Sequence, residues 1–537
     1  MPGDVRSKGG AIHVALASID MKYLAIQAFG WILYCSGSVS LAQDFTPGAS
    51  AMGRGRPSAV PVVSFALELV ARSGDEPPGR PGESFTVFAD PTVGAGGSIA
   101  FRGDFDGPLS GNQGIYLASR GSGLQRVVDD SFDFSPPGQS GASSWTSFGP
   151  PVLDGLDRLV FWGGFSFGDN SQGVYAFDGA LGEVIFDDNP LQSIPGHPAG
   201  NGFTTFPFSA ATRPTGGGGK RGVSGATFLD VGFVSQQGLY VGAPTSGIAG
   251  VADTTISPPG QPGAARFTAF GSGLASNAGG DVVFRGTFSG GVGSQGIYRY
   301  IHASSSLVCV ADASLSVPGQ AGSASFTSFD GLISTNNAGV VAFQATYASG
   351  SGNNGVYLGD GLGALTRIAD NSGAIAVPGQ PSAAFSAFGS ASVNRAGDVL
   401  FSATVSGGTS GIFLASGGNL QSVLNFADPV PGQPGATFFA VGYSTLNGRG
   451  HVAVNARYSG GSGDEGLYFF DGGGLFRVVD ESDTSLGLSI TNLHANVFTG
   501  PSGGQDGRPE FLGNDDTLSV RASLLGGDQA ILRATLE

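Results

Sequence analysis

Cysteine is almost absent from this chain of 537 residues, which has only Cys35 and Cys309. Cys35 lies in an apolar stretch near the N-terminus that reads as an export signal, so Cys309 would have no partner in the mature chain. A disulfide framework is therefore excluded, and the fold must be held together by packing. We expect Cys309, within the apolar residues 307–310, to be a buried structural thiol and not a nucleophile.

Positive charge is also scarce, since lysine occurs only as Lys8, Lys22 and Lys220 and the formal net charge is −16. A surface of that sign repels phosphate backbones and anionic lipid headgroups. No basic stripe is present for a nucleic acid to follow. We therefore expect no nucleic-acid partner, no membrane span in the mature chain, and a monomer.

Tryptophan is rare and charged residues are few, whereas glycine and phenylalanine are abundant. The chain has 3 Trp, 39 Phe and 94 Gly, and 12% of its residues are charged. Short apolar runs separated by Gly and Pro are typical of strands joined by turns, and they argue against long helices.

The apolar runs return in eight units, at intervals of about sixty residues, and a period of this length indicates a repeat architecture. Each unit has four strand-like segments, and the clearest one contains, in order, Phe326 and Phe329, Ala342-Phe343, Val356-Tyr357, and Ala369-Asp370. An Asn-x-x-Gly turn, such as Asn336 to Gly339, joins the first two segments. We expect it to be a hairpin device, with Gly in the left-handed conformation.

The repeat is shifted by one strand. Only seven fourth segments follow a third segment, and the eighth lies before the first unit, at residues 67–71. Pairing this segment with the last unit, near Ile531, would close a ring and remove an exposed sheet edge. The sequence predicts an all-β, eight-bladed β-propeller over residues 61–537, with four-stranded antiparallel blades. Seven blades would result if the divergent third or last unit were irregular.

The N-terminal region resembles an export signal. Lys22 provides the positive charge, residues 23–35 the apolar stretch, and Ser40-Leu41-Ala42 a cleavage site with small residues. We expect residues 1–20 to be an upstream extension, 21–42 a signal peptide and 43–60 a flexible linker. The mature protein would then begin at Gln43 and be secreted, either extracellular or periplasmic.

The repeat resembles a family of exported bacterial tandem-repeat proteins that is named for an NxxG turn followed shortly by Ala-Phe. Asn336-x-x-Gly339 with Ala342-Phe343 carries this resemblance most clearly. Members of that family often end in a sorting tail, an apolar helix followed by basic residues. Here the end of the chain, residues 530–537, reads as a strand, so the resemblance does not extend to a membrane anchor.

The best candidate site is the Asp that ends the fourth segment of most units: Asp129, Asp187, Asp253, Asp312, Asp370 and Asp480. Carboxylates beside loop carbonyls form an oxygen-rich environment that suits calcium. The alternative is that each Asp closes a turn by accepting backbone N–H bonds, and we favour it because a turn needs the same residue in every copy.

Other catalytic patterns are missing from the sequence. His197, His302, His451 and His494 are not at metal-ligand spacing, and we expect them to be isolated surface or turn residues. No Ser or Cys has a nucleophile-elbow context. The acidic irregularities Asp464-Glu465 and Asp515-Asp516 are expected to be solvated turns.

Two functions remain open. The first is a secreted, non-enzymatic propeller that acts as a binding or surface-structural module, with a glycan or an extracellular protein as partner and no obligatory cofactor. The alternative is a secreted propeller enzyme that acts on carbohydrate, as a glycoside hydrolase or lyase, which would need a specific carboxylate pair in one or two irregular units. In either case we expect recognition on the face with the fourth-to-first and second-to-third connections, where loops vary most.

Overall fold

The computed structural model describes residues 63–537 apart from 95, 108–110, 132–133, 140–142, 154–156, 167–170, 178–181, 189–192, 199–201, 209–221, 230–234, 244–246, 272, 331, 496–501 and 504–509. The chain divides into two units, Met1–Ser38 and Val39–Glu537, and all described residues belong to the second. The expected extension, signal peptide and linker, residues 1–60, lie outside the described residues.

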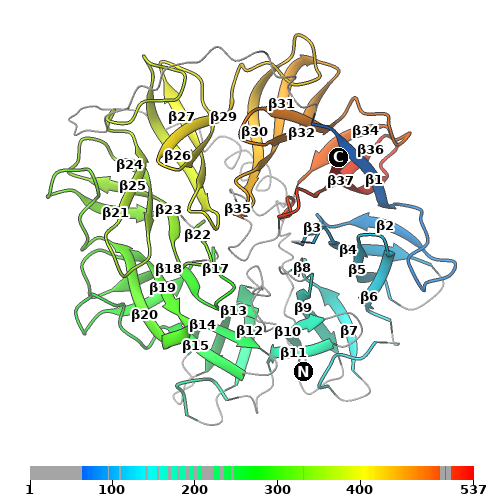
Figure 1. The fold of residues 1–537 in the computed structure, drawn as a ribbon. Coiled ribbons are helices and arrows are strands. Elements are labelled where there is room, and N and C mark those ends of the chain that lie inside the picture. Colours follow the sequence, from blue (N-terminus) through cyan, green and yellow to red (C-terminus); the bar gives the residue numbers. More distant parts are fainter. Residues whose placement is uncertain are drawn as a thin grey trace, which may run out of the picture. The chain divides into compact units, whose positions relative to one another are not determined.

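The second unit is an eight-bladed β-propeller, as predicted (Figure 1). Each blade is an antiparallel sheet of four main strands, which we call A to D in the order in which they pair. In Figure 1 the short strands β3, β8, β17, β22 and β35 lie nearest the centre of the ring. Four of them continue strand A of their own blade, so strand A forms the inner edge.

The strands of the first four blades have the following bounds. Blade 1 contains β2 (Ser84–Phe88), β3 (Thr92–Val93), β4 (Ile99–Asp106), β5 (Gln113–Ser119) and β6 (Gly123–Asp129). Blade 2 contains β7 (Ser144–Phe148), β8 (Val152–Leu153), β9 (Leu159–Ser166), β10 (Gln172–Phe177) and β11 (Gly182–Asp187). Blade 3 contains β12 (Phe203–Phe208), β13 (Gly222–Leu229), β14 (Ser235–Ala243) and β15 (Gly247–Asp253). Blade 4 contains β16 (Arg266–Phe270), β17 (Ala275–Ser276), β18 (Val282–Ser289), β19 (Gln295–Ile301) and β20 (Ser306–Asp312), with the 3₁₀ turn η2 (His302–Ser304) after β19.

The other four blades complete the ring. Blade 5 contains β21 (Ser325–Phe329), β22 (Ser334–Thr335), β23 (Val341–Ala348), β24 (Asn354–Gly359) and β25 (Thr366–Asp370). Blade 6 contains β26 (Ala384–Val393), β27 (Val399–Ser406), β28 (Gly411–Ser416) and β29 (Asn419–Asn425). Blade 7 contains β30 (Thr437–Leu446), β31 (Val452–Gly461), β32 (Gly463–Phe470) and β33 (Leu475–Asp480), and β35 (Ser502–Gly503) pairs with β30 in parallel. Blade 8 contains β34 (Ile490–His494), β36 (Leu518–Leu524), β37 (Gln529–Leu536) and β1 (Phe65–Arg72).

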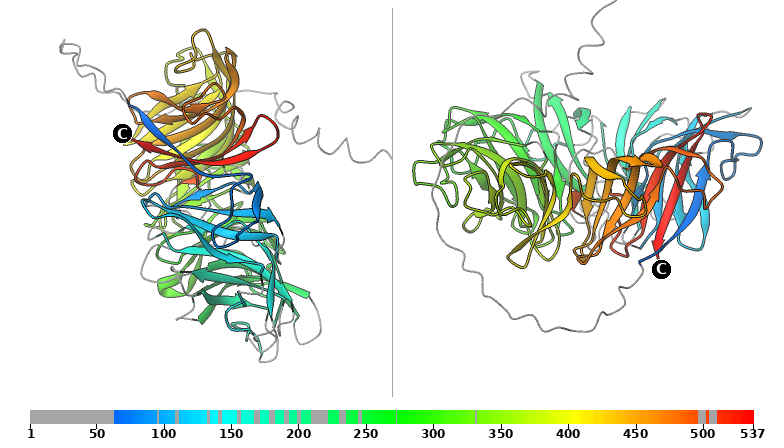
Figure 2. Two further views of the ribbon diagram at one scale, coloured as in Figure 1. Left: turned by 90° about the vertical axis from the view of Figure 1, so that its right-hand side faces the viewer. Right: turned by 90° about the horizontal axis from the view of Figure 1, so that it is seen from above.

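The first described strand closes the ring, as the shifted repeat predicted. β1 pairs antiparallel with β37, from Phe65 opposite Leu536 to Arg72 opposite Ala530. Both views in Figure 2 show β1, in blue, alongside the red C-terminal strands. The expected strand at the end of the chain is also confirmed, since β37 runs to Leu536.

Aromatic and aliphatic side chains fill the space between neighbouring blades. In one cluster, Ile297 and Val310 of blade 4 pack with Phe326, Phe343 and Tyr357 of blade 5. Burying each such side chain contributes about 1.5–3 kcal/mol, so the interfaces can hold the ring without disulfides. Cys309 is only partly buried, at the edge of the blade 3–4 cluster, and burial raises the pKa of its thiol.

The Gly two residues before the strand-C Tyr has a packing reason. Gly355 of β24 faces Asp370 of β25 in the sheet register. A Cβ on Gly355 would lie 2.7 Å from the Tyr357 hydroxyl, 2.8 Å from the Ala369 carbonyl and 3.0 Å from the Asp370 Cβ. The Gly-apolar-Tyr motif therefore lets the Tyr ring lie along its own strand, with its hydroxyl next to the Asp that ends strand D.

Helices contribute almost nothing to this fold. Within the described part of the chain, no helix has the length and apolar character needed to cross a bilayer.

Candidate functional site

The six candidate Asp residues each lie at the end of strand D of a different blade, as expected. The structure distributes them among six blades and does not bring them together. Asp129, Asp312, Asp370 and Asp480 are completely buried, and Asp187 is nearly so. Among the described residues, no group of three His, Cys, Asp or Glu side chains is arranged to hold a metal ion.

Asp370 shows what these carboxylates bind. Its Oδ1 accepts hydrogen bonds from the backbone N–H of Ser372 (3.2 Å) and from the Ser372 hydroxyl (2.6 Å). Its Oδ2 accepts from the Gln320 side-chain amide (2.7 Å) and from the Arg367 guanidinium (2.9 Å). Both oxygens are therefore bonded to protein donors, which supports the role in turn closure. Turn closure without calcium at these positions stays a prediction.

The Gln of the Pro-Gly-Gln segment bridges two parts of its blade by hydrogen bonds, the B–C turn and the end of strand D. Gln320 lies in the loop that enters blade 5, and its Oε1 accepts from the Ser351 N–H (2.7 Å) in the B–C turn of that blade. Its amide nitrogen binds Asp370 at the end of strand D. The same contact to the strand-D carboxylate is made by Gln139 to Asp187 (3.1 Å), His197 to Asp253 (3.1 Å), Gln261 to Asp312 (2.6 Å) and Gln433 to Asp480 (2.9 Å). In blade 1, Arg80 occupies the Gln position and lies 3.6 Å from Asp129.

The Asn-x-x-Gly turns are hairpin devices, as predicted, with Gly in the left-handed region. The φ angles are 85° at Gly280, 79° at Gly339, 88° at Gly397 and 86° at Gly450. The backbone N–H of each Gly donates to the carbonyl of its Asn, at 2.9–3.1 Å.

The sequence did not reveal that the Asn of each turn also binds the next blade. Asn277 Nδ2 donates to the Asn336 carbonyl (3.1 Å), and Asn336 Nδ2 donates to the Asn394 carbonyl (2.9 Å). The series continues from Asn394 to the Asn447 carbonyl and from Asn447 to the Gly513 carbonyl, both at 3.1 Å. These buried bonds join the inner edges of blades 4 to 8. Spacing within one unit cannot predict them, because each partner lies a whole repeat away.

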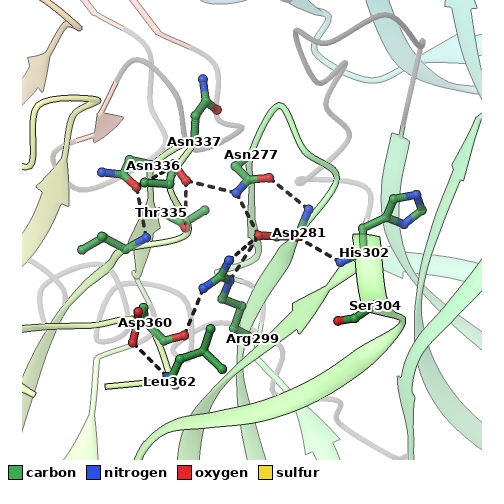
Figure 3. Close-up of polar contacts among 12 residues, drawn as sticks. Asn277, Asp281, Arg299, His302, Ser304, Thr335, Asn336, Asn337, Asp360 and Leu362 are labelled. Atoms are coloured by element: carbon green, nitrogen blue, oxygen red, sulfur yellow. Dashed lines mark hydrogen bonds and ion pairs between the residues drawn. The ribbon is translucent and has the colours of Figure 1, made fainter. Parts of the chain in front are cut away.

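Figure 3 shows an ion pair that reinforces this series between blades 4 and 5. Asp281 accepts from Asn277 Nδ2 (3.1 Å), from Arg299 Nη2 (2.7 Å) and from the His302 backbone N–H (3.0 Å). Arg299 Nη1 donates across the blade boundary to the Asp360 carbonyl (3.0 Å). Arg299 is 6% exposed and Asp281 7% exposed, so the pair is a buried structural contact.

The expectation that Asp515-Asp516 is a solvated turn is wrong for Asp516, which is 1% exposed. It stands where other turns have Gly, with φ 67°, and it accepts from His451 Nδ1 (2.8 Å) and Arg449 Nη1 (2.6 Å) of blade 7. Burial alone would raise the pKa of Asp516, but the hydrogen bonds from His451, Asn447 and Arg449 and the charge of His451 hold it below its usual value. The histidines were expected to be isolated, and His451 and His197 are instead bonded to carboxylates.

Glu465 was also expected to be solvated, but it is 7% exposed. It stands before the strand-C Gly, where five of the other seven blades have Gln at the equivalent position. Such a Gln binds strand A of the next blade, as in Gln113 to the Thr146 carbonyl (3.2 Å). Glu465 can only accept, and it does so from the Leu493 N–H (3.3 Å), while Asn455 donates to the Leu493 carbonyl (3.3 Å). Gln113 likewise accepts from the Phe148 N–H (3.2 Å), so Glu465 keeps the accepting half of this contact. Asn455 takes the place of Arg102, which donates to the Phe148 carbonyl (3.3 Å). Aligning the repeats on Gln-Gly-apolar-Tyr would have placed Glu465 at a position that contacts the next blade, where Gln113 and its equivalents are partly buried.

Strand A of every blade contains a β-bulge at one position, where the strand register shifts by one residue. A bulge directs its extra side chain away from the paired sheet. The extra residues are Thr86, Thr146, Thr204, Thr268, Thr327, Ser386, Phe439 and Thr491. Seven of them carry a hydroxyl, and only blade 7 has an aromatic side chain, Phe439, which is 47% exposed. Blade 7 therefore departs from the repeat on its solvent-facing inner strand.

Comparison with known proteins gives a family for this chain. Residues 63–140 and 219–516 match the model of a family of unknown function, DUF7453. The matched ranges cover more than half of the chain. The chain belongs to the DUF7453 family. None of the curated proteins matches this DUF7453 chain.

Several solved structures are similar to the DUF7453 propeller. The Dos1 propeller has a TM-score of 0.34 and 11% identity, over 85% of this chain and 95% of that chain. A puromycin-hydrolyzing peptidase of Mycobacterium tuberculosis has a TM-score of 0.33 and 14% identity over 72% of this chain, which spans only 50% of the peptidase. Trypanosoma rangeli sialidase has a TM-score of 0.25 and 11% identity, over 88% of this chain and 59% of that chain. With every TM-score below 0.5, these similarities bear on neither the activity nor the ligand of the DUF7453 chain.

Proposed function

We propose that this chain is a secreted, non-enzymatic β-propeller that acts as a binding or structural module outside the cytoplasm. Its partner is a glycan or an extracellular protein. One observation carries the proposal: the polar residues that repeat are bonded into the scaffold, as Asp370 is to Gln320 and Asn277 is to Asn336, whereas strand A of blade 7 exposes an aromatic side chain, Phe439, at the bulge where the other blades have Thr or Ser. A rigid repeated scaffold with one irregular surface is typical of proteins in which loops and exposed side chains carry recognition.

Export is supported by the N-terminal signal pattern and by the resemblance to the exported NxxG repeat proteins. We expect secreted material to begin at Gln43 or within a few residues of it. N-terminal sequencing of the secreted protein checks this, and protein retained in the cytoplasm with residues 23–35 intact would contradict it.

Binding is tested with a chain that begins at Gln43, applied to a glycan array and to a panel of purified extracellular proteins. The proposal expects a specific ligand on one of the two. Each bound glycan is then incubated with the protein and assayed for new reducing ends and for unsaturated products. Turnover would support the alternative carbohydrate-active enzyme, and the absence of any ligand on both surfaces would contradict a binding role.

A further inference from the structure

Blade 7 carries aromatic side chains at both irregular positions of its inner strand. Phe439 is the extra residue of the first bulge, where other blades have Thr or Ser. The second register shift lies between Val441 and Ser444 and includes Tyr443, which is partly buried. The corresponding shift in β26 of blade 6 includes Ser390. Bulges re-aim side chains next to functional sites. Tyr443 packs in part against the blade 7–8 cluster, whereas Phe439 is 47% exposed and calls for an explanation beyond packing.

Charged side chains accompany the two rings, and they are paired with one another. The Arg457 guanidinium lies over the Phe439 ring, 5.9 Å from its centroid, and Arg457 Nη2 binds Asp464 Oδ2 at 2.8 Å. Both partners are about half exposed, with side-chain exposures of 49% and 54%. Near Tyr443, Arg521 of blade 8 binds Asp90 of blade 1 at 2.7 Å.

The Tyr443 hydroxyl and the nearby His494 imidazole are neutral hydrogen-bonding groups near pH 7. Burial, followed by the charges of Asp90 and Glu465, raises the pKa of the Tyr443 hydroxyl, which therefore stays protonated. Burial and the Arg521 charge lower the pKa of His494, whose Nε2 lies 3.1 Å from the Ser523 hydroxyl. Burial also raises the pKa of Glu465. The surface therefore offers aromatic faces, hydroxyl and imidazole groups, and ion pairs whose charges are already compensated.

This combination selects a class of ligand. An anionic ligand would need a cation that is free to pair with it, but Arg457 and Arg521 are each bonded to a carboxylate. An apolar partner would leave the exposed Arg457–Asp464 pair desolvated, which is costly. A neutral pyranose fits both requirements, since one face of C–H groups can pack on an aromatic ring while its hydroxyls bond to the rim of polar groups.

We infer that Phe439 and Tyr443, together with Arg457 and Asp464, form a binding site for a neutral oligosaccharide on the inner strand of blade 7. This inference rests on the proposed binding function and names the ligand class and the residues. Asp464 follows the β31–β32 turn, so the site lies on the face that bears the second-to-third connections.

The test uses variants that restore the repeat and should therefore fold. Phe439→Thr introduces the residue found at six other bulges, and Tyr443→Ser introduces the residue of blade 6. Phe439→Tyr keeps an aromatic face, and Leu362→Ala removes a 69% exposed apolar side chain from the C–D turn of blade 5 as a matched control. Thermal melts confirm folding. The probes are arrayed neutral gluco-, galacto- and manno-oligosaccharides beside sialylated and sulfated ones, followed by calorimetry with the strongest neutral ligand.

We expect Phe439→Thr and Tyr443→Ser each to weaken neutral-glycan binding by about tenfold or more, whereas Phe439→Tyr and Leu362→Ala bind like the parent. Neutral-glycan binding that both repeat-restoring variants leave unchanged would overturn this site while leaving the binding function in place. A response confined to sialylated or sulfated glycans would overturn the ligand class. If no glycan binds, the inference fails, and the proposed function then depends on the extracellular-protein panel alone.

Discussion

The guanidinium of Arg299 fills the space that a side chain on Gly339 would occupy. A Cβ built on Gly339 overlaps Nη1, Nη2 and Cζ of Arg299. The two residues belong to different blades, since Arg299 lies on β19 of blade 4 and Gly339 in the Asn-x-x-Gly turn of blade 5. Gly339 is therefore required twice, once for its left-handed φ of 79° and once for the passage of Arg299 toward the Asp360 carbonyl.

Two glycine substitutions separate these requirements. Gly397 occupies the same place in the blade 6 turn, with φ 88°, but a Cβ there would meet no atom within 4 Å. Gly397→Ala should lose about 1–2 kcal/mol of unfolding free energy through backbone strain alone. Gly339→Ala should lose about 3 kcal/mol more, because it displaces one partner of a buried ion pair. Denaturant unfolding of both variants measures the difference, and equal losses would show that Arg299 moves aside without cost.

Much of the fold could be predicted from the sequence because the patterns that determine each blade lie close together in the chain. The aromatic pairs, the Asn-x-x-Gly turns and the Asp at the end of strand D each lie within one unit and recur from unit to unit. Residues 67–71 could be recognised as the displaced strand because they repeat the fourth segment of the other units. The hydrogen bonds between blades could not be predicted from the sequence. Asn277 reaches the Asn336 carbonyl only because ring closure places the two turns side by side.

In the candidate site, too, the positions of the residues could be predicted from the sequence, whereas their contacts between segments could not. The Asp positions were predicted correctly, but their bonds to Gln320 and its equivalents depend on how the entering loop folds back over strand D. Glu465 and Asp516 were assigned to solvated turns because adjacent acidic residues usually lie in water. Both replace a residue of the repeat, Gln and Gly respectively, and so take a position that faces the neighbouring blade and not the solvent.

Replacing Glu465 with Gln should change how stability depends on pH. Burial raises the pKa of Glu465 above its usual 4.5, so the folded chain keeps the proton to a higher pH than the unfolded chain does. Between these two pKa values the unfolded state loses its proton first, and folding stability falls as the pH rises. Glu465→Gln does not titrate. We expect the variant to match the parent near pH 4 and to be more stable at pH 7, as measured by thermal melts across this range.

Asp464→Asn is the matched control, because it removes a carboxylate from the adjacent residue, whose side chain is 54% exposed. Its stability profile should run parallel to that of the parent. A Glu465→Gln variant that is less stable than the parent at pH 7 would show that the ionised carboxylate, bonded to Asn455 and the Leu493 N–H, is the stabilising form.

Calcium should not bind at the strand-D carboxylates. Both oxygens of Asp370 already accept hydrogen bonds from Ser372, Gln320 and Arg367, and calcium would have to displace these donors. We expect millimolar calcium to give no heat in isothermal titration and no shift in Tm after chelation. Asp370→Asn should lose about 1–3 kcal/mol in the absence of calcium, because Arg367 loses its anionic partner. Calcium-dependent heat that disappears in Asp370→Asn would restore the calcium hypothesis.

Ring closure by β1 is tested by comparing a chain that begins at residue 61 with one that begins at residue 73. The shorter chain leaves the backbone edge of β37 unpaired and exposes Ile531 and Leu532, which are otherwise completely buried. It also removes Phe65 and Leu67, which pack partly buried against the blade 7–8 cluster. Each lost apolar contact costs up to about 1.5–3 kcal/mol, and an open edge promotes aggregation. We expect a clearly lower Tm together with concentration-dependent aggregation in light scattering.

A synthetic peptide of residues 63–72, added to the shorter chain, distinguishes loss of this strand from a general effect of truncation. The peptide can pair with β37 by strand addition, in which main-chain hydrogen bonds give affinity and alternate side chains give register. We expect it to raise the Tm and suppress aggregation, whereas the same peptide with Ala66→Pro should not. Ala66 lies two residues from Ser64, whose carbonyl accepts from the Glu537 N–H, so the Ala66 N–H also faces β37 and proline removes this donor from the ladder. A shorter chain that melts like the longer one, with no response to either peptide, would falsify ring closure by β1.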